Sequence, residues 1–143
     1  MFVTIVSLLF IQPALAVTEK AILGTWVNAE GDGIIEITQQ QEMFIGTITG
    51  STSPDSHARR DINNPDPDLR DRPLQGVEII QGITYKKENL WAGGLIYDPN
   101  NGKTYNCKLS LNEDGTLSIR GYAGLPLFGR TEVWTRADNS IVH

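Results

Sequence analysis

The sequence has little of what most enzymes and metal proteins need. Its one cysteine, Cys107, cannot form a disulfide within the chain. Its two histidines, His57 and His143, lie far apart and one is terminal, which argues against a histidine metal site or a catalytic triad. No serine or threonine stands in a nucleophile motif, and no helix follows the Gly31-Asp32-Gly33 turn to cradle a phosphate. The sequence therefore predicts a protein that is not an enzyme and holds no metal or cofactor.

Basic clusters are also missing. The chain has 12 Lys and Arg against 17 Asp and Glu, which gives a net charge of −5. Nucleic-acid binding needs a cationic footprint that neutralises phosphates, so a nucleic-acid partner is not expected. The same acidic balance disfavours anionic membrane surfaces.

Long apolar runs are absent as well. The apolar stretch at residues 2–11 covers about ten residues, whereas a membrane span needs about 20. Pro13 interrupts it, and the small residues Ala14 and Ala16 follow, which is typical of an export signal cleaved after Ala16. The alternative is a buried N-terminal strand or helix. We expect a mature chain of residues 17–143 in the periplasm or secreted, with no transmembrane segment.

The rest of the sequence has the length of one domain. Apolar residues recur mostly at spacing two, in short runs separated by Gly, Asn, Asp and Pro, which is typical of β-strands. Residues 76–80 fit neither period cleanly and could begin a short helix. Between residues 50 and 73 the composition is polar and rich in Pro, which predicts one long loop. The expected strands are residues 23–27, 33–38, 42–49, 77–85, 90–97, 103–111, 116–122 and 128–136.

The short turns between most of these strands predict antiparallel neighbours, because parallel strands would need helical crossovers. Eight twisted strands tend to close, since closure removes both exposed edges. We therefore expect an all-β, eight-stranded, antiparallel up-and-down barrel with one long polar loop. The interior of such a barrel holds packed side chains or one small ligand.

Two segments carry the most specific pattern. Residues 61–73 form a polar loop punctuated by Pro65, Pro67 and Pro73, and residues 91–105 form a strand-turn-strand run around Asp98-Pro99-Asn-Asn-Gly102. Together with Gly24-Thr25-Trp26 and residues 129–136, they resemble the secreted bacterial family DUF2147. The resemblance spans residues 22–136 and implies a lipocalin-like (calycin-like) β-barrel. The family has no settled activity, so the resemblance implies a fold and an exported location.

Gly24-Thr25-Trp26 near the start, paired with an arginine on the last strand, also resembles the structural signature of lipocalin-like barrels. There the cation lies over the indole and seals one end. Arg136 or Arg130 would be the partner of Trp26. Desolvated cation–π contacts contribute about 2 kcal/mol, which makes Trp26 and Arg136 candidates for a structural end plug.

In the last strand Arg130 and Glu132 share a face with Trp134. If that face points inward, they form a charged pair in the barrel, and the desolvation of such a pair would indicate an anchor for a polar ligand. If it points outward, the ions are merely solvated. The candidate ligand-binding residues are Trp91, Tyr97, Tyr105, Arg130 and Glu132.

Three interpretations fit the loop at residues 61–72. Its oxygens could bind calcium, although their spacing does not match the helix-loop-helix pattern. Two carboxylates could converge for hydrolysis. The third interpretation is structural, with Asn and Asp satisfying loop amides and Arg70 tying Asp residues to the barrel rim. Its candidate rim residues are Asp61, Asn63, Asp66, Arg70 and Arg72.

Taken together, these patterns favour an exported barrel, monomeric or weakly dimeric, that binds a small hydrophobic or amphipathic molecule. The alternative is an envelope protein-interaction module with a filled barrel that acts through residues 61–72. The two differ in interior bulk, because inward aromatic side chains at positions 26, 44, 91, 128 and 134 would leave little lumen.

Overall fold

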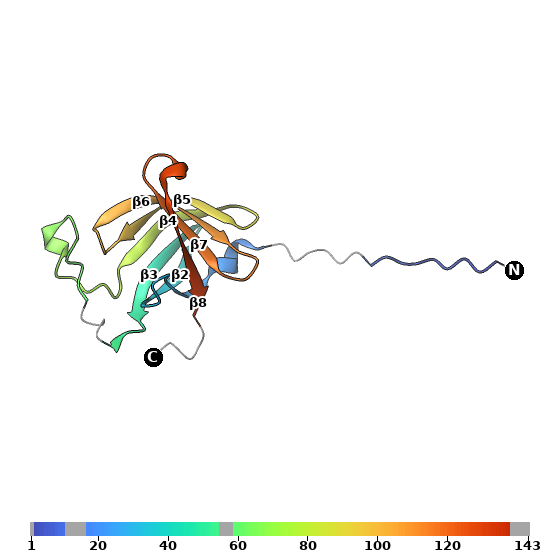
Figure 1. Cartoon of the computed structure of the whole chain (residues 1–143), viewed down its shortest axis with the longest axis horizontal. Helices are drawn as coiled ribbons and strands as arrows, with labels where there is room; N and C mark the ends of the chain where they lie inside the picture. The colour runs from blue at the N-terminus through green and yellow to red at the C-terminus, as the bar shows by residue number, and fades with distance from the viewer. Residues whose placement is uncertain (1, 11–16, 55–58, 138–143) are drawn as a thin grey trace.

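The computed structural model describes residues 2–10, 17–54 and 59–137, and within them the chain forms a closed β-barrel (Figure 1). Each strand pairs antiparallel with the next, and β1 closes the barrel by pairing with β8 through Trp26 and Arg136. The expected all-β, eight-stranded, up-and-down barrel is confirmed. In chain order the strands are β1 (Gly24–Val27), β2 (Gly33–Gln40), β3 (Met43–Ser51), β4 (Glu78–Lys87), β5 (Leu90–Asp98), β6 (Lys103–Leu111), β7 (Leu117–Tyr122) and β8 (Arg130–Arg136).

Most strand boundaries follow the alternation of apolar and polar residues. Strand β6 has the expected bounds, residues 103–111. Residues 76–80 lead into strand β4, so the alternative of a short helix at this point is wrong. The last strand begins at Arg130, two residues later than expected. Pro126–Phe128 forms instead a short 3₁₀ helix, η4, in the β7–β8 loop.

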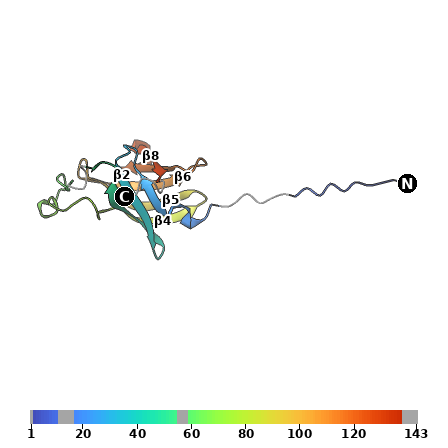
Figure 2. The same cartoon turned by 90° about the horizontal axis from the view of Figure 1, so that it is seen from below.

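Antiparallel pairing places alternate connections at opposite ends of the barrel. The β1–β2, β3–β4, β5–β6 and β7–β8 connections share one end, which we call the open end. The β2–β3, β4–β5 and β6–β7 turns share the other, the closed end. Residues 59–77 of the long β3–β4 connection lie on the opposite side of the barrel from residues 2–10 in both views (Figures 1 and 2).

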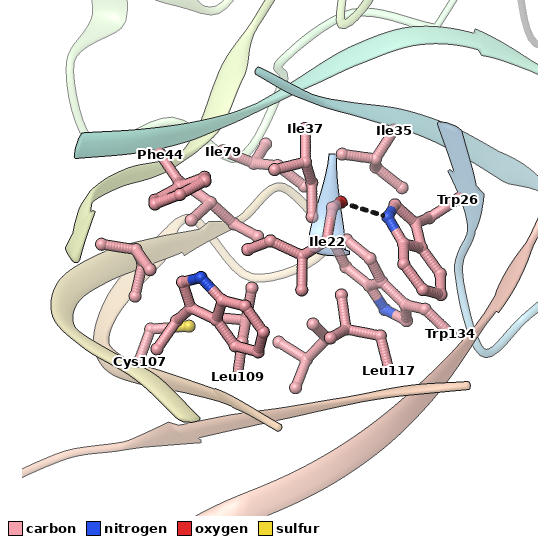
Figure 3. Packing of buried hydrophobic residues seen from close by; sticks show 14 of the residues in the cluster. Ile22, Trp26, Ile35, Ile37, Phe44, Ile79, Cys107, Leu109, Leu117 and Trp134 are labelled. Atoms are coloured by element: carbon pink, nitrogen blue, oxygen red, sulfur yellow. Dashed lines mark hydrogen bonds between the residues drawn. The ribbon is translucent and has the colours of Figure 1, made fainter. Parts of the chain in front are cut away.

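The closed half of the barrel is filled by large apolar side chains. Trp26 and Trp91 are fully buried, Phe44 is 1% exposed and Trp134 is 2% exposed. They pack with inward residues of β2, β4, β6 and β7 (Figure 3). Cys107 is part of this cluster, and burial raises the pKa of its thiol to about 12. The thiol therefore stays protonated and serves as a small apolar side chain.

A short 3₁₀ helix, η1 (Glu19–Ile22), closes this end of the barrel. Trp26 Nε1 donates to the Ile22 carbonyl at 2.9 Å (Figure 3), and Trp91 Nε1 donates to the Glu19 carbonyl at 3.1 Å. The Arg136 guanidinium lies 3.9 Å from the centre of the Trp26 ring and donates to the carbonyls of Ala21 and Leu23. The cation over Trp26 is thus Arg136, and it binds η1 as well as the indole.

Strand β5 contains a bulge at its two central glycines. The register with β6 shifts between Ala92 and Gly94, and Gly93 adopts a φ of +86°. A Cβ on Gly94 would lie 2.3 Å from the Gln81 carbonyl oxygen of β4. The glycines therefore allow a bend and a close approach of two strands.

Residues 2–10 are exposed and belong to no helix or strand. The expected cleavage site after Ala16 lies outside the described residues, since 11–16 are not among them. In the part of the chain that is described, no helix has the length and apolar character needed to cross a membrane.

Candidate ligand-binding cavity

The open half of the barrel contains a cavity of about 340 Å³. Its inner wall is apolar, because the strands contribute their inward side chains nearest the open end. On β7 the next position of this wall is Gly121. Because glycine has no side chain, this position leaves space inside the cavity. The apolar residues of the inner wall include Ile35, Ile48, Ile79, Ile96, Ile119 and Trp134.

The mouth of the cavity is polar and carries charges of both signs. Arg59 and Arg130 supply the positive charge, and Arg59 Nη1 lies 3.7 Å from an Asp32 carboxylate oxygen. Glu30, Asp32 and Glu132 supply the negative charge. The cavity thus changes from apolar to charged along its depth, and an amphipathic molecule would match both parts.

Arg130 and Glu132 form an ion pair at the mouth, with 3.1 Å between Arg130 Nη2 and Glu132 Oε1. They share the inward face with Trp134, yet the Arg130 side chain is 81% exposed and that of Glu132 is 35% exposed. Such a solvated pair contributes only about 0–1 kcal/mol to stability. The pair lies inside the cavity rim without the desolvation cost expected for a buried pair.

The cavity brings together most of the residues that the sequence suggested as ligand contacts. Tyr97, Tyr105, Arg130 and Glu132 line it. Trp91 lies instead in the core of the closed half, where β5 begins. The sequence reasoning did not single out the isoleucine wall or Gly121. The sequence does contain this information, because these residues occupy inward positions in the part of each strand that lies towards the long loop.

The loop that borders the open end, residues 59–73, is here called the rim loop. Its centre is Asp61, whose side chain is fully buried. The carboxylate accepts hydrogen bonds from Tyr97 Oη at 2.5 Å, from Asn64 Nδ2 at 2.8 Å, and from Arg72 Nε at 2.9 Å. Arg72 Nη2 lies 2.9 Å from the same carboxylate. A buried carboxylate with this set of donors is satisfied, and it attaches the rim loop to β5.

The rim loop also packs on the β5–β6 turn. Asn63 Nδ2 donates to the carbonyls of Pro99 and Asn100, at 3.0 and 3.1 Å. The Asn63 carbonyl oxygen comes so close to Gly102 that a Cβ there would lie 1.9 Å away. The two segments with the most specific sequence patterns, 61–73 and 91–105, therefore pack against each other. This explains why the turn has a glycine at position 102.

The other polar residues of the rim loop serve the loop itself. Asp66 accepts from the Asp68 amide at 2.9 Å and caps η3 (Pro67–Leu69). Arg70 Nε donates to the Asn64 carbonyl at 2.8 Å. Among the described residues, no three His, Cys, Asp or Glu side chains gather where they could hold a metal ion. The observed contacts correspond to the structural interpretation of the loop, except that Arg72 and not Arg70 pairs with an aspartate.

The sequence profile of a family described as "Uncharacterized protein conserved in bacteria (DUF2147)" matches residues 24–136. The chain belongs to the DUF2147 family. The match runs from the first strand to the last, so it covers the barrel, the rim loop and the cavity.

This DUF2147 chain is also similar to a solved structure. It is described as "Protein HP1028 from the human pathogen Helicobacter pylori belongs to the lipocalin family". The TM-score is 0.74 at 24% identity, over 83% of this chain and 84% of that one. Comparison with curated proteins finds no match. The likeness shows that the DUF2147 barrel has the lipocalin fold.

The contact between Asp61 and Tyr97 shifts the pKa of both groups. Burial alone would raise the pKa of Asp61, but the hydrogen bonds from Tyr97, Asn64 and Arg72 and the charge of Arg72 hold it below its usual value. Burial, and then the hydrogen bond to Asp61 and its negative charge, raise the pKa of Tyr97 to about 12. The folded protein thus favours a carboxylate paired with a neutral phenol.

These shifts predict loss of stability at both extremes of pH. Asp61 has the lower pKa when folded, so its contribution is present above about pH 4 and is lost as the pH falls through the folded value. Tyr97 has the higher pKa when folded, so its contribution is present below about pH 10 and is lost as the pH rises towards the folded value. Urea unfolding of the wild type and Tyr97→Phe should show a stability difference that narrows above about pH 10. A difference that is constant with pH would contradict this assignment.

Proposed function

We propose that this DUF2147 protein is an exported barrel that binds a small hydrophobic or amphipathic molecule in the cavity at its open end. The observation that carries the proposal is the cavity of about 340 Å³, with an isoleucine wall and a charged mouth. Ligand sites commonly have volumes of about 300–1,000 Å³ and combine apolar walls with a few polar groups. The cavity is near the small end of that range, which favours a small guest.

The distribution of polarity supports an orientation for the guest. An apolar part would contact Ile35, Ile79 and Ile119, away from water, and a polar part would remain near Arg130 and Glu132 at the mouth. The Tyr97 hydroxyl already donates to Asp61, so Tyr97 would contribute its ring rather than a hydrogen bond. Because Arg130 is solvated, it can turn toward an anionic group at little cost.

Export rests on the predicted signal segment and its cleavage after Ala16. The position of η1 supports export, because this helix begins at Glu19, just beyond the expected mature start at Val17. A chain cut at that point would keep every residue whose carbonyl binds Trp26, Trp91 or Arg136.

The alternative, a filled barrel that acts through residues 61–72, is less well supported. The side chains of Trp26, Phe44, Trp91 and Trp134 do point into the barrel, but the first three fill its closed half, and Trp134 belongs to that core and also lines the cavity. Phe128 is 75% exposed at the mouth, and a cavity remains behind it. The buried part of the rim loop is used to hold the loop on β5.

Gly121 offers a direct test of the cavity. Its φ lies outside the left-handed region, and a Cβ there would make ordinary contacts of 3.5 Å with Ile96 and 3.6 Å with Tyr105. A Gly121→Leu side chain should therefore enter the cavity and occupy it. We expect native mass spectrometry of gently purified protein to show a bound small molecule in the wild type. In Gly121→Leu we expect the dissociation constant to rise by about tenfold, as loss of a contact area of leucine size implies, and the bound fraction to fall accordingly.

Asn106→Leu is the matched control, because Asn106 is exposed on the outer face of the neighbouring strand β6. It adds the same side chain outside the barrel and should keep the bound molecule. Thermal unfolding of both variants checks that the fold is retained. The proposal fails if the wild type carries no molecule and binds no fluorescent fatty-acid probe. It also fails if Gly121→Leu binds the same molecule as tightly as the wild type does.

A further inference from the structure

The β7–β8 loop presents three large apolar side chains to solvent beside the cavity mouth. Leu125 is 64% exposed, Leu127 is 81% exposed and Phe128 is 75% exposed. We call these three residues the apolar tip. The loop projects from the barrel (Figure 1, top), and Phe128 also lines the cavity. Other exposed apolar side chains of the barrel strands, such as Met43 and Leu95, are each only about half exposed.

The apolar tip is held in place by its own loop. Arg120 donates to the Pro126 carbonyl through Nε at 2.9 Å and through Nη2 at 2.6 Å. The Phe128 amide donates to the Leu125 carbonyl at 3.1 Å within η4. A Cβ on Gly129 would lie 2.8 Å from the Gly121 carbonyl oxygen, so the base of the loop packs tightly on β7. The exposed side chains therefore stand on an ordered backbone, and docking would lose little loop entropy.

The shape of the apolar tip favours a lipid surface over a protein as its partner. A stable protein–protein interface buries about 800 Å² on each side, and three side chains on a narrow projecting loop supply only a fraction of that. A protein would also need a matching hollow to receive them. A lipid interface adapts to a small convex group, and it accepts apolar side chains at the boundary of headgroups and acyl chains.

The charges around the apolar tip agree with a lipid surface. Arg130, with its side chain 81% exposed, follows the loop directly, and Arg120 lies beneath it. Arg130 can contact a lipid phosphate, whereas the guanidinium of Arg120 is bonded to Pro126 and Thr131, and the net charge of −5 opposes attraction to a strongly anionic membrane. The combination fits zwitterionic phospholipid, with apolar insertion as the main driving force.

We propose that the apolar tip inserts into the interfacial region of a phospholipid bilayer and places the open end of the barrel at the lipid surface. The three side chains together carry about as many carbon atoms as one myristoyl chain, which alone gives marginal, reversible binding of about 10⁴ M⁻¹. The contact is therefore weak and releases the protein again. It goes beyond the proposed function, since it requires no molecule in the cavity.

The test is cosedimentation of the purified protein with vesicles of phosphatidylcholine and phosphatidylethanolamine at millimolar lipid. We expect the wild type to partition onto the vesicles, with little change on adding salt, because apolar contacts are not screened. Leu127→Asp should lower the partition coefficient by at least about tenfold, since it removes a leucine side chain and adds a charge. Leu127 is not among the residues that line the cavity, so the variant should keep its binding of a fluorescent fatty-acid probe.

Met43→Asp is the matched control, because Met43 is 47% exposed on the β2–β3 hairpin at the closed end. It should partition as the wild type does. Absence of wild-type partitioning, or an equal loss in both variants, would overturn the proposal. So would a wild-type dimer in sedimentation velocity that Leu127→Asp dissociates, because the apolar tip would then bind a second copy. Failure of vesicle binding with intact probe binding would leave the proposed function standing.

Discussion

Gly94→Ala is expected to lower the free energy of unfolding by about 3 kcal/mol or more, because strand β4 has no room for a Cβ. That atom would lie 2.3 Å from the Gln81 carbonyl oxygen and 2.6 Å from the Ile83 amide nitrogen. Both are backbone atoms of a paired strand, so they cannot turn aside as a flexible side chain would. Relief would require separation of β4 and β5 at the bulge. Urea unfolding followed by tryptophan fluorescence measures the loss, since Trp91 lies on the same strand.

Gly121→Ala is the control, as it makes the same substitution in a neighbouring part of the sheet. A Cβ there has ordinary contacts, and alanine restricts the unfolded chain, so we expect a change between zero and about 1 kcal/mol of added stability. Equal losses in both variants would show that the close approach of β4 to Gly94 is not what makes the glycine necessary.

Asp61→Ala is expected to destabilise the protein by about 2–4 kcal/mol, because it removes the buried partner of an ion pair and leaves its donors without an acceptor. Tyr97 Oη and Asn64 Nδ2 lose their hydrogen bonds, and Arg72 loses its carboxylate. The Arg72 side chain is 36% exposed and can gain water, which keeps the loss below that of a fully buried pair.

The same substitution should loosen the rim loop before the barrel unfolds. The Asp61 amide donates to the Arg72 carbonyl, and the Leu74 amide donates to the Arg59 carbonyl, and these bonds close the base of the loop. In Asp61→Ala we expect faster hydrogen exchange at both amides, whereas amides of β6 should change only with global stability.

Asp66→Ala is a matched control on the same loop. Asp66 is exposed and accepts from the Asp68 amide as the cap of η3, so its loss should cost about 1 kcal/mol or less. If the two substitutions cost the same, Asp61 would have no special place in attaching the rim loop.

The fold could be predicted because the period-two pattern is strong where strands are regular. Residues 103–111 alternate cleanly, and β6 has those bounds. The pattern was weak at residues 77–83, and the structure gives the reason. Gly82 has a φ of +72°, the register of β4 with β3 shifts twice, and both Ile79 and Ile80 are buried. A bulge changes which side chains point inward, and a count of apolar spacings cannot reveal it.

The cavity was only partly predictable, because strand position along the barrel axis matters as much as the inward face. Trp91 has the right face but begins β5 at the closed end, whereas Tyr97 lies near the other end of the same strand, at the cavity mouth. In an up-and-down barrel the long loop marks one end, and the direction of each strand then follows. That reasoning would have placed Trp91 in the core. Tyr97, one of the three partners of Asp61, lies 36 positions away from it in the sequence, and only the folded contact identifies this partner.

Because only half of the interior is filled, different parts of the same eight strands determine the stability of the fold and the shape of the cavity. Side chains such as Trp26 and Leu117, packed beneath η1, maintain the fold, and substitutions among them carry large penalties. Those around Ile48, Ile119 and Gly121 border empty volume, where a larger or smaller residue changes the shape of the chamber more than the cohesion of the barrel. Substitutions around the cavity can therefore change its shape while the barrel folds equally well, and a designer could reshape the chamber without rebuilding its base.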